Sequence, residues 1–143
     1  MLAEGKVAKV VTGFCHAAIV EVDVEPSPTT EISTHCSGEG WIRQGSLEDA
    51  TADGYTSWKD GAESGVRFAL AHIGRTARVR IERVTGMITD TNATCCAVAA
   101  ARAVWNGLGY SAPDEIDDKL HASLVGSFDS PDEVAPIFRN ETQ

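Results

Sequence analysis

Residues 77–105, ARVRIERVTGMITDTNATCCAVAAARAVW, decide the fold. Apolar Ala77, Val79 and Ile81 alternate with charged residues, which predicts a strand with one buried face. The alternation changes phase near Arg83-Val84, and such a slip is typical of a β-bulge. Residues 95–105 are almost wholly apolar and rich in alanine, so we expect a buried helix that lies close against a sheet or a second helix.

The segment that precedes this stretch has helical periodicity. Its apolar side chains recur at spacings of three and four, at Trp58, Ala62, Val66, Ala69, Leu70 and Ile73. This spacing predicts an amphipathic helix from about residue 55. Gly74 follows it directly and is suited to be its C-terminal cap.

The N-terminal part is predicted to be β-structure. Residues 18–25 alternate between apolar and acidic side chains, and the two prolines in residues 26–30 indicate a turn. We therefore expect residues 31–37 to return as a hairpin partner, followed by a third short strand at Trp41-Ile42-Arg43. Near the C-terminus, Pro113 and Pro131 stand where prolines commonly begin helices, which predicts two short helices.

The order of these elements places the chain in the α+β class. We expect a two-layer sandwich of order β-β-β-α-β-α, with both helices on one sheet face and the other face open to water or a partner. Residues 1–110 are expected to form a single domain. Residues 111–143 are expected to form a helical tail that packs on it.

Composition narrows the classes of partner. The 143 residues include 12 Lys and Arg against 21 Asp and Glu, a net charge of −9. Such a surface repels phosphate backbones, so nucleic acid is a poor candidate partner. The sequence shows no basic leader and no apolar run near the ~18 residues of a membrane span. We therefore expect no membrane association, a cytoplasmic location and four reduced cysteines.

Residues 58–70, WKDGAESGVRFAL, resemble the first helix of domain IV of elongation factor G. The resemblance continues through the alternating residues 77–88, the Asp90-Thr91-Asn92 cap and the alanines of residues 97–101. It implies the three-strand, helix, strand, helix fold of that domain and a non-catalytic binding or interaction module of bacterial type. The chain departs from the family in two ways: it has no GxxxxGK[ST] loop, and Met87-Ile88-Thr89 stands where the family has a histidine.

The residues Asp90, Thr91, Asn92 and Thr94 form the first candidate site. They place hydroxyls, a carboxylate and free backbone N–H groups at a strand-to-helix junction, where a small anionic ligand could bind. Simple capping of the helix explains the same residues without a ligand. The alternative function is therefore a small-molecule enzyme or ligand-binding protein centred here, with His16 or His35 as an acid–base partner.

The pairs Cys15-His16 and His35-Cys36 are of the residue types that bind zinc. The expected hairpin would separate His16 from the residue facing His35 by roughly 13 Å at ~3.3 Å per residue, too far for one ion. We therefore expect no metal and no cofactor. Cys95 and Cys96 could be reactive thiols at a helix start, but small core residues are the preferred interpretation.

Arg78, Arg80 and Trp41 are the candidates for a partner surface. Alternation places both arginines on one face of a strand, where they could meet an acidic protein partner or could simply be solvated. A homodimer that covers the free sheet face is a third alternative. The preferred prediction is a non-catalytic module that uses this face.

Overall fold

The computed structural model describes residues 1–41 and 47–139. Its strands are β1 (Leu2–Val11), β2 (Phe14–Pro26), β3 (Glu31–Thr34), β4 (Gly40–Trp41), β5 (Leu47–Asp49) and β6 (Ala77–Met87). Its helices are α1 (Thr56–Ile73), α2 (Ala93–Leu108) and α3 (Asp114–Ser123), followed by the 3₁₀ turns η1 (Ser127–Asp129) and η2 (Pro136–Phe138). None of the helices in these ranges is long and apolar enough to cross a membrane.

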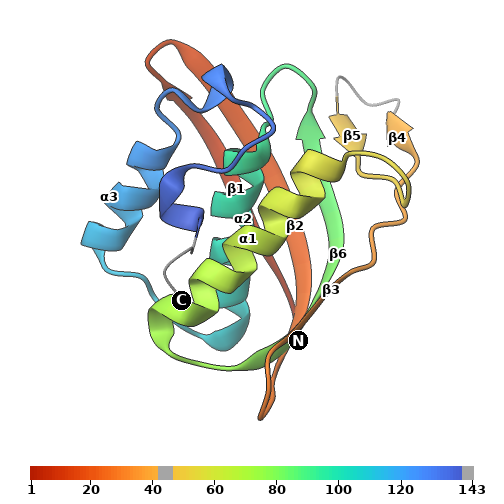
Figure 1. The fold of residues 1–143 in the computed structure, drawn as a ribbon, viewed down its shortest axis with the longest axis vertical. Helices are drawn as coiled ribbons and strands as arrows, with labels where there is room; N and C mark the ends of the chain where they lie inside the picture. Colours follow the sequence, from red (N-terminus) through yellow and green to blue (C-terminus); the bar gives the residue numbers. More distant parts are fainter. Residues whose placement is uncertain (42–46, 140–143) are drawn as a thin grey trace.

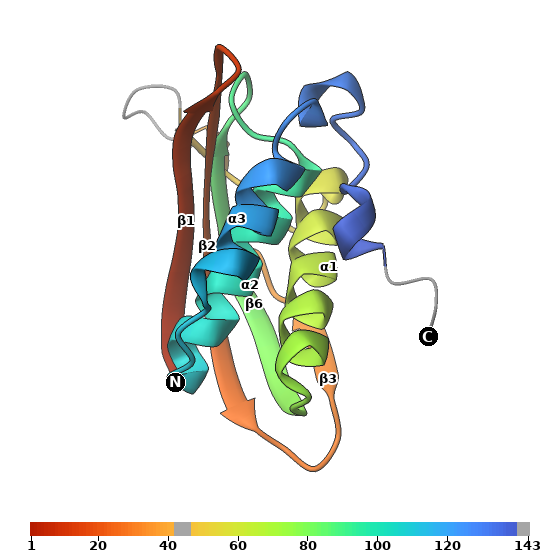
Figure 2. The same cartoon turned by 90° about the vertical axis from the view of Figure 1, so that its left-hand side faces the viewer.

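The structure is a two-layer α+β sandwich, as the sequence predicts. Figure 2 shows the sheet nearly edge-on, with α1, α2 and α3 all on one of its faces. Alternate valines of β2 and β6 point into this layer and are fully buried, among them Val20, Val22 and Val79. The α2 helix is buried over most of its surface and forms the centre of the core.

β1 and β2 form a long antiparallel hairpin that the sequence analysis did not predict (Figure 1). The turn is Thr12-Gly13, with φ of 50° and 86°, and a two-residue turn with positive φ at both positions matches the twist of the strands it joins. Ala8 and Val10 on the outer face are exposed. Both faces of β1 therefore carry apolar residues, so the sequence lacks a clear alternation here.

The predicted hairpin between residues 18–25 and 31–37 is wrong. β2 pairs with β1 along one edge and with β6 along the other, so it has no edge left for a third strand. β3 instead crosses to the far edge of β6 and pairs with it in parallel, from Glu31 opposite Arg78 to Thr34 opposite Ile81. Of the third predicted strand, Trp41 lies in β4, while Ile42 and Arg43 lie outside the described residues.

The predicted features around β6 and the two long helices are confirmed. The register of β2 and β6 shifts between Glu21 and Val22 opposite residues 81–83, close to the predicted bulge. Gly74 ends α1 with φ 61°. Asn92 caps α2 by accepting a hydrogen bond from the Cys95 amide at 2.8 Å.

The C-terminal residues lie against the start of α2. α3 follows Pro113 as predicted, whereas Pro131 begins no helix and lies in a turn between the 3₁₀ turns η1 and η2. The Ala93 amide donates to the Pro131 carbonyl at 2.9 Å. The backbone thus brings residues 131–132 next to the N-terminal end of α2.

Candidate functional site

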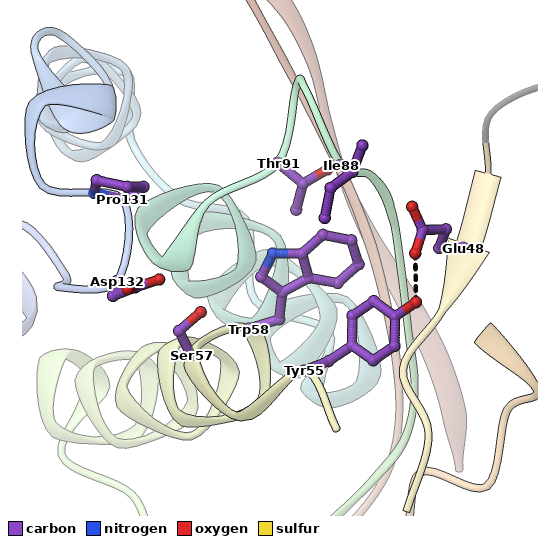
Figure 3. A pocket seen from close by; sticks show the side chains of 8 residues that line it. All are labelled: Glu48, Tyr55, Ser57, Trp58, Ile88, Thr91, Pro131 and Asp132. Carbon is purple, nitrogen blue, oxygen red and sulfur yellow. Dashed lines mark hydrogen bonds between the residues drawn. The ribbon is translucent and has the colours of Figure 1, made fainter. Parts of the chain in front are cut away.

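A cavity of about 400 Å³ lies where β5, the first turn of α1, the β6–α2 loop and the C-terminal segment meet (Figure 3). This volume lies in the range of small-molecule sites. Other hollows in the described part of the chain measure about 170–250 Å³. We call it the Trp58 cavity; its lining residues are Glu48, Tyr55, Ser57, Trp58, Ile88, Thr91, Pro131 and Asp132.

The aromatic floor of the cavity comes from the start of α1. Trp58 is only 5% exposed, and its ring centroid lies 4.9 Å from that of Tyr55. Tyr55 is the residue before the helix and has a left-handed backbone, φ 59° and ψ 36°, which costs a non-glycine residue about 1–3 kcal/mol. The structure tolerates this cost at the position that places the phenol beside the indole.

The Tyr55 phenol also connects α1 to the sheet. Its hydroxyl donates a hydrogen bond to the Glu48 carboxylate on β5, and this bond raises the pKa of Tyr55 to about 12. The phenol is therefore neutral at physiological pH. Glu48 keeps further lone pairs that can accept hydrogen bonds from a ligand.

The β6–α2 loop supplies the opposite wall. The Thr91 hydroxyl donates to the Ala17 carbonyl on β2 and accepts from the Met87 amide at 2.8 Å. These two bonds fix the loop against the sheet. Ile88, in the same loop, is 64% exposed at the mouth of the cavity.

The electrostatic character of the cavity is acidic. Glu48 and Asp132 lie at opposite ends of it, with the Trp58 indole between them (Figure 3). None of the described residues that line it is basic. The nearby Lys59 ammonium is held outside by the carbonyls of Thr51 and Ala52, at 2.8 and 3.0 Å, so the two carboxylates have no neutralising partner within this lining.

Only one residue of the predicted Asp90–Thr94 site lines this cavity, namely Thr91. Asn92 is 1% exposed and uses its amide to cap α2 and to donate to the Ser127 hydroxyl at 2.8 Å. The Thr94 hydroxyl accepts from the Ala135 amide at 3.0 Å. Asp90 is half-buried and accepts from Thr89. The C-terminal segment therefore covers the helix start where an anion was predicted.

The structure does not bring His16 and His35 together. His16 lies on β2, whose Ala17 amide bonds to the Asp90 carbonyl at 2.9 Å, whereas His35 follows β3 on the far side of β6. The buried His16 ring lies 5.0 Å from Phe128. Its Nδ1 bonds to the Phe14 carbonyl, and its Nε2 has no partner among the described residues, so neither nitrogen bonds to Asp90.

The candidate partner surface is exposed, but its arginines are paired. Arg78 bonds to Glu25 at 2.7 Å, and Arg80 lies 3.2 Å from Glu82. Trp41 is 63% exposed. The two arginines thus carry little net positive charge for an acidic partner.

The cysteines are distributed as core residues rather than as a cluster. Cys36, Cys95 and Cys96 are buried and Cys15 is exposed, and all four are free thiols. Burial raises the pKa of Cys95 to about 11. Within residues 1–41 and 47–139, no three His, Cys, Asp or Glu side chains are grouped as metal ligands would be.

Most of the Trp58 cavity was missed by the sequence analysis. The sequence predicts Trp58 on the buried face of a helix, which is correct. It does not indicate that one edge of the side chain lines a cavity. Tyr55, three residues earlier, gave a weak signal, because aromatic residues at this spacing adjoin each other at a helix start. Glu48 and Asp132 gave none.

Comparison with known proteins gives only distant likenesses. No protein-family model and no curated protein matches the sequence. A crystal structure of a protein from Thermus thermophilus aligns with 72% of this chain and 15% of its own, at 17% identity and a TM-score of 0.49. Mevalonate kinase from methicillin-resistant Staphylococcus aureus aligns with 94% of this chain and 45% of its own, at 19% identity and a TM-score of 0.38. The chain thus spans less than half of either.

Proposed function

We propose that the protein is a non-catalytic binding module and that the Trp58 cavity is its recognition site. The observation that carries the proposal is a hollow of about 400 Å³ with two aromatic rings and two carboxylates at its wall. Ligand sites combine an apolar lining with a few placed polar groups in this way. The left-handed backbone conformation of Tyr55 supports the proposal, because residues with strained backbones cluster at binding sites.

We also propose that the fold is that of elongation factor G domain IV. The elements that carry the sequence resemblance, α1, β6 and the Asn92-capped α2, follow one another in the expected order. A module with this fold would act either as one domain of a larger protein or as a separate protein bound to a larger assembly. The partner surface at Arg78, Arg80 and Trp41 remains part of this proposal.

The alternative is a small-molecule site at residues 90–94. The geometry reduces the residues of this site that face the Trp58 cavity to one, Thr91. Thr91 lines the Trp58 cavity, whereas Asn92 and Thr94 are engaged by the chain itself. A small molecule that reached Thr91 would occupy the same cavity. The two hypotheses therefore share one test.

The test is a ligand screen by two-dimensional NMR on the full chain, with fragments of cationic, anionic and neutral classes. The chain has three tryptophans, and the spectrum of Trp58→Phe identifies the indole signal of Trp58. We expect ligands that move this signal and lose their effect in Ser57→Phe, which fills the cavity. Thr56→Phe is the matched control, because Thr56 is exposed and does not line the cavity. Failure of every class to move the Trp58 signal would overturn the proposal.

A further inference from the structure

We propose that the Trp58 cavity selects an organic cation, an ammonium or guanidinium group with a hydrogen-bond acceptor next to it. This inference rests on the proposed function and adds the chemistry of the ligand. Its elements are the two carboxylates, the aromatic floor and the solvent-accessible indole N–H of Trp58.

The charge of the lining favours a cation. Glu48 and Asp132 are its two ionisable acids, and no lysine, arginine or histidine among the described residues lines the cavity to balance them. Lys59 directly follows Trp58 in the sequence, and two backbone carbonyls already hold its ammonium. A cation that enters would therefore be attracted by two carboxylates, with no competing cationic side chain among the described lining residues.

The aromatic floor suits the same ligand. A cation over the face of an indole or phenol is attracted by the ring quadrupole, most strongly by tryptophan. The Trp58 and Tyr55 rings lie 4.9 Å apart and are tilted by 50°, so they form two walls of a corner. Glu48 is tied to the Tyr55 hydroxyl and so lies next to that corner.

A free donor indicates the second part of the ligand. The indole N–H of Trp58 makes no hydrogen bond to a described residue, and its nitrogen is not one of the buried side-chain atoms left without a partner, so it is open to solvent at the cavity. In Figure 3 the indole nitrogen faces the space between Thr91 and Pro131. A hydroxyl or carbonyl oxygen on the ligand would replace water as the acceptor of this donor.

The experiment compares choline with its uncharged isostere 3,3-dimethylbutan-1-ol by calorimetry and by the Trp58 indole signal. Choline is expected to bind about tenfold more tightly, within the range of a desolvated cation–π contact, and its affinity should fall with salt. Glu48→Gln keeps the acceptor for Tyr55 but removes a charge, and it should weaken choline about fivefold or more. Asp132→Asn should act in the same direction. Asp60→Asn is the control, since Asp60 is an exposed acid outside the lining.

Two further probes distinguish a free cation from a side chain of a partner protein. Agmatine and an acetylated Gly-Arg-Gly amide carry the same guanidinium group. Tighter binding of the peptide would assign the site to an arginine of a partner, and equal or weaker binding would assign it to a free small molecule. Equal affinities for choline and its isostere, unchanged in Glu48→Gln, would overturn the cation inference and leave the proposed function standing. If no probe of any charge class binds in the Trp58 cavity, both the cation inference and the proposed function are overturned.

Discussion

Gly65 of α1 lies in backbone contact with Ala97 of α2, so close that a methyl group on Gly65 would overlap the Ala97 carbonyl oxygen. Gly61, one turn earlier, makes the same contact with Ala93. These two glycines allow the helices to cross without intervening side chains. The crossing fixes the start of α1, and with it Tyr55 and Trp58, against the β6–α2 loop.

We expect Gly65→Ala to lower the free energy of unfolding by about 1–3 kcal/mol, the usual cost of overpacking. Alanine is the better helix former by about 1 kcal/mol, so a loss of stability would show that the contact outweighs propensity. Urea unfolding measures the change. Ser64→Ala, at the preceding half-buried position, should leave stability within about 0.5 kcal/mol. A Gly65→Ala protein as stable as wild type would contradict the described crossing.

Asn92 is expected to act in stability rather than in ligand binding. Asn92→Ala removes the cap on the Cys95 amide and the bond to Ser127, at a total cost of about 1–3 kcal/mol. Ser127→Ala removes only the second bond and should cost less. Thermal and urea unfolding of both variants provide the comparison. An Asn92→Ala protein of unchanged stability that lost an anionic ligand would instead favour the original site at residues 90–94.

The elements that the sequence predicts well are those whose signals are local. The α2 helix is apolar all round, β6 alternates cleanly from Ala77 to Ile81, and Asn92 and Gly74 mark helix ends by their own side-chain and backbone chemistry. Each of these can be derived without knowing what lies next to the element.

Strand pairing cannot be derived in this way. β3 has only four residues, and whether it pairs with β2 or β6 depends on which edges are free. β1 occupies one edge of β2, and nothing in the local pattern of β1 indicates this, because Ala8 and Val10 interrupt its alternation. The error in the predicted hairpin follows from the missing strand.

The Trp58 cavity was inaccessible to sequence reasoning for a similar reason. Its walls come from residues 48, 55, 57, 58, 88, 91, 131 and 132, which meet only through long-range packing. The predicted site at residues 90–94 lay next to it. Local chemistry identified the junction correctly, but it could not show that the C-terminal segment covers the helix start and leaves only Thr91 at the cavity.

The four thiols are expected to differ sharply in reactivity. Cys15 is exposed, whereas burial raises the pKa of Cys36, Cys95 and Cys96 and so keeps them as thiols. The thiolate is the reactive form, so an aromatic disulfide reagent at pH 8 should label one cysteine rapidly in the native protein. Cys15→Ser should remove this fast phase, and urea should expose the other three. A fast-reacting thiol in Cys15→Ser would contradict the buried placement of the three remaining cysteines.

The Tyr55–Glu48 hydrogen bond makes stability depend on alkaline pH. The bond raises the pKa of Tyr55 to about 12, above the ordinary value of about 10. A raised pKa in the folded state favours the neutral phenol, so its contribution is fully present below pH 10 and is lost as pH rises through 12. Absorbance of tyrosinate in Tyr110→Phe, which leaves Tyr55 as the only tyrosine, measures the value directly.

Glu48→Gln is the matched variant for this titration, because it keeps an acceptor for the phenol but removes the charge that opposes its ionisation. In the Tyr110→Phe background we expect it to shift the tyrosinate transition to lower pH. The same variant should weaken choline binding. One substitution therefore tests both the Glu48–Tyr55 hydrogen bond and the contribution of the Glu48 charge to cation affinity. An unshifted transition would mean that Glu48 and Tyr55 are not bonded in solution, and the Glu48 carboxylate would then not be held beside the aromatic corner, as the cation inference requires.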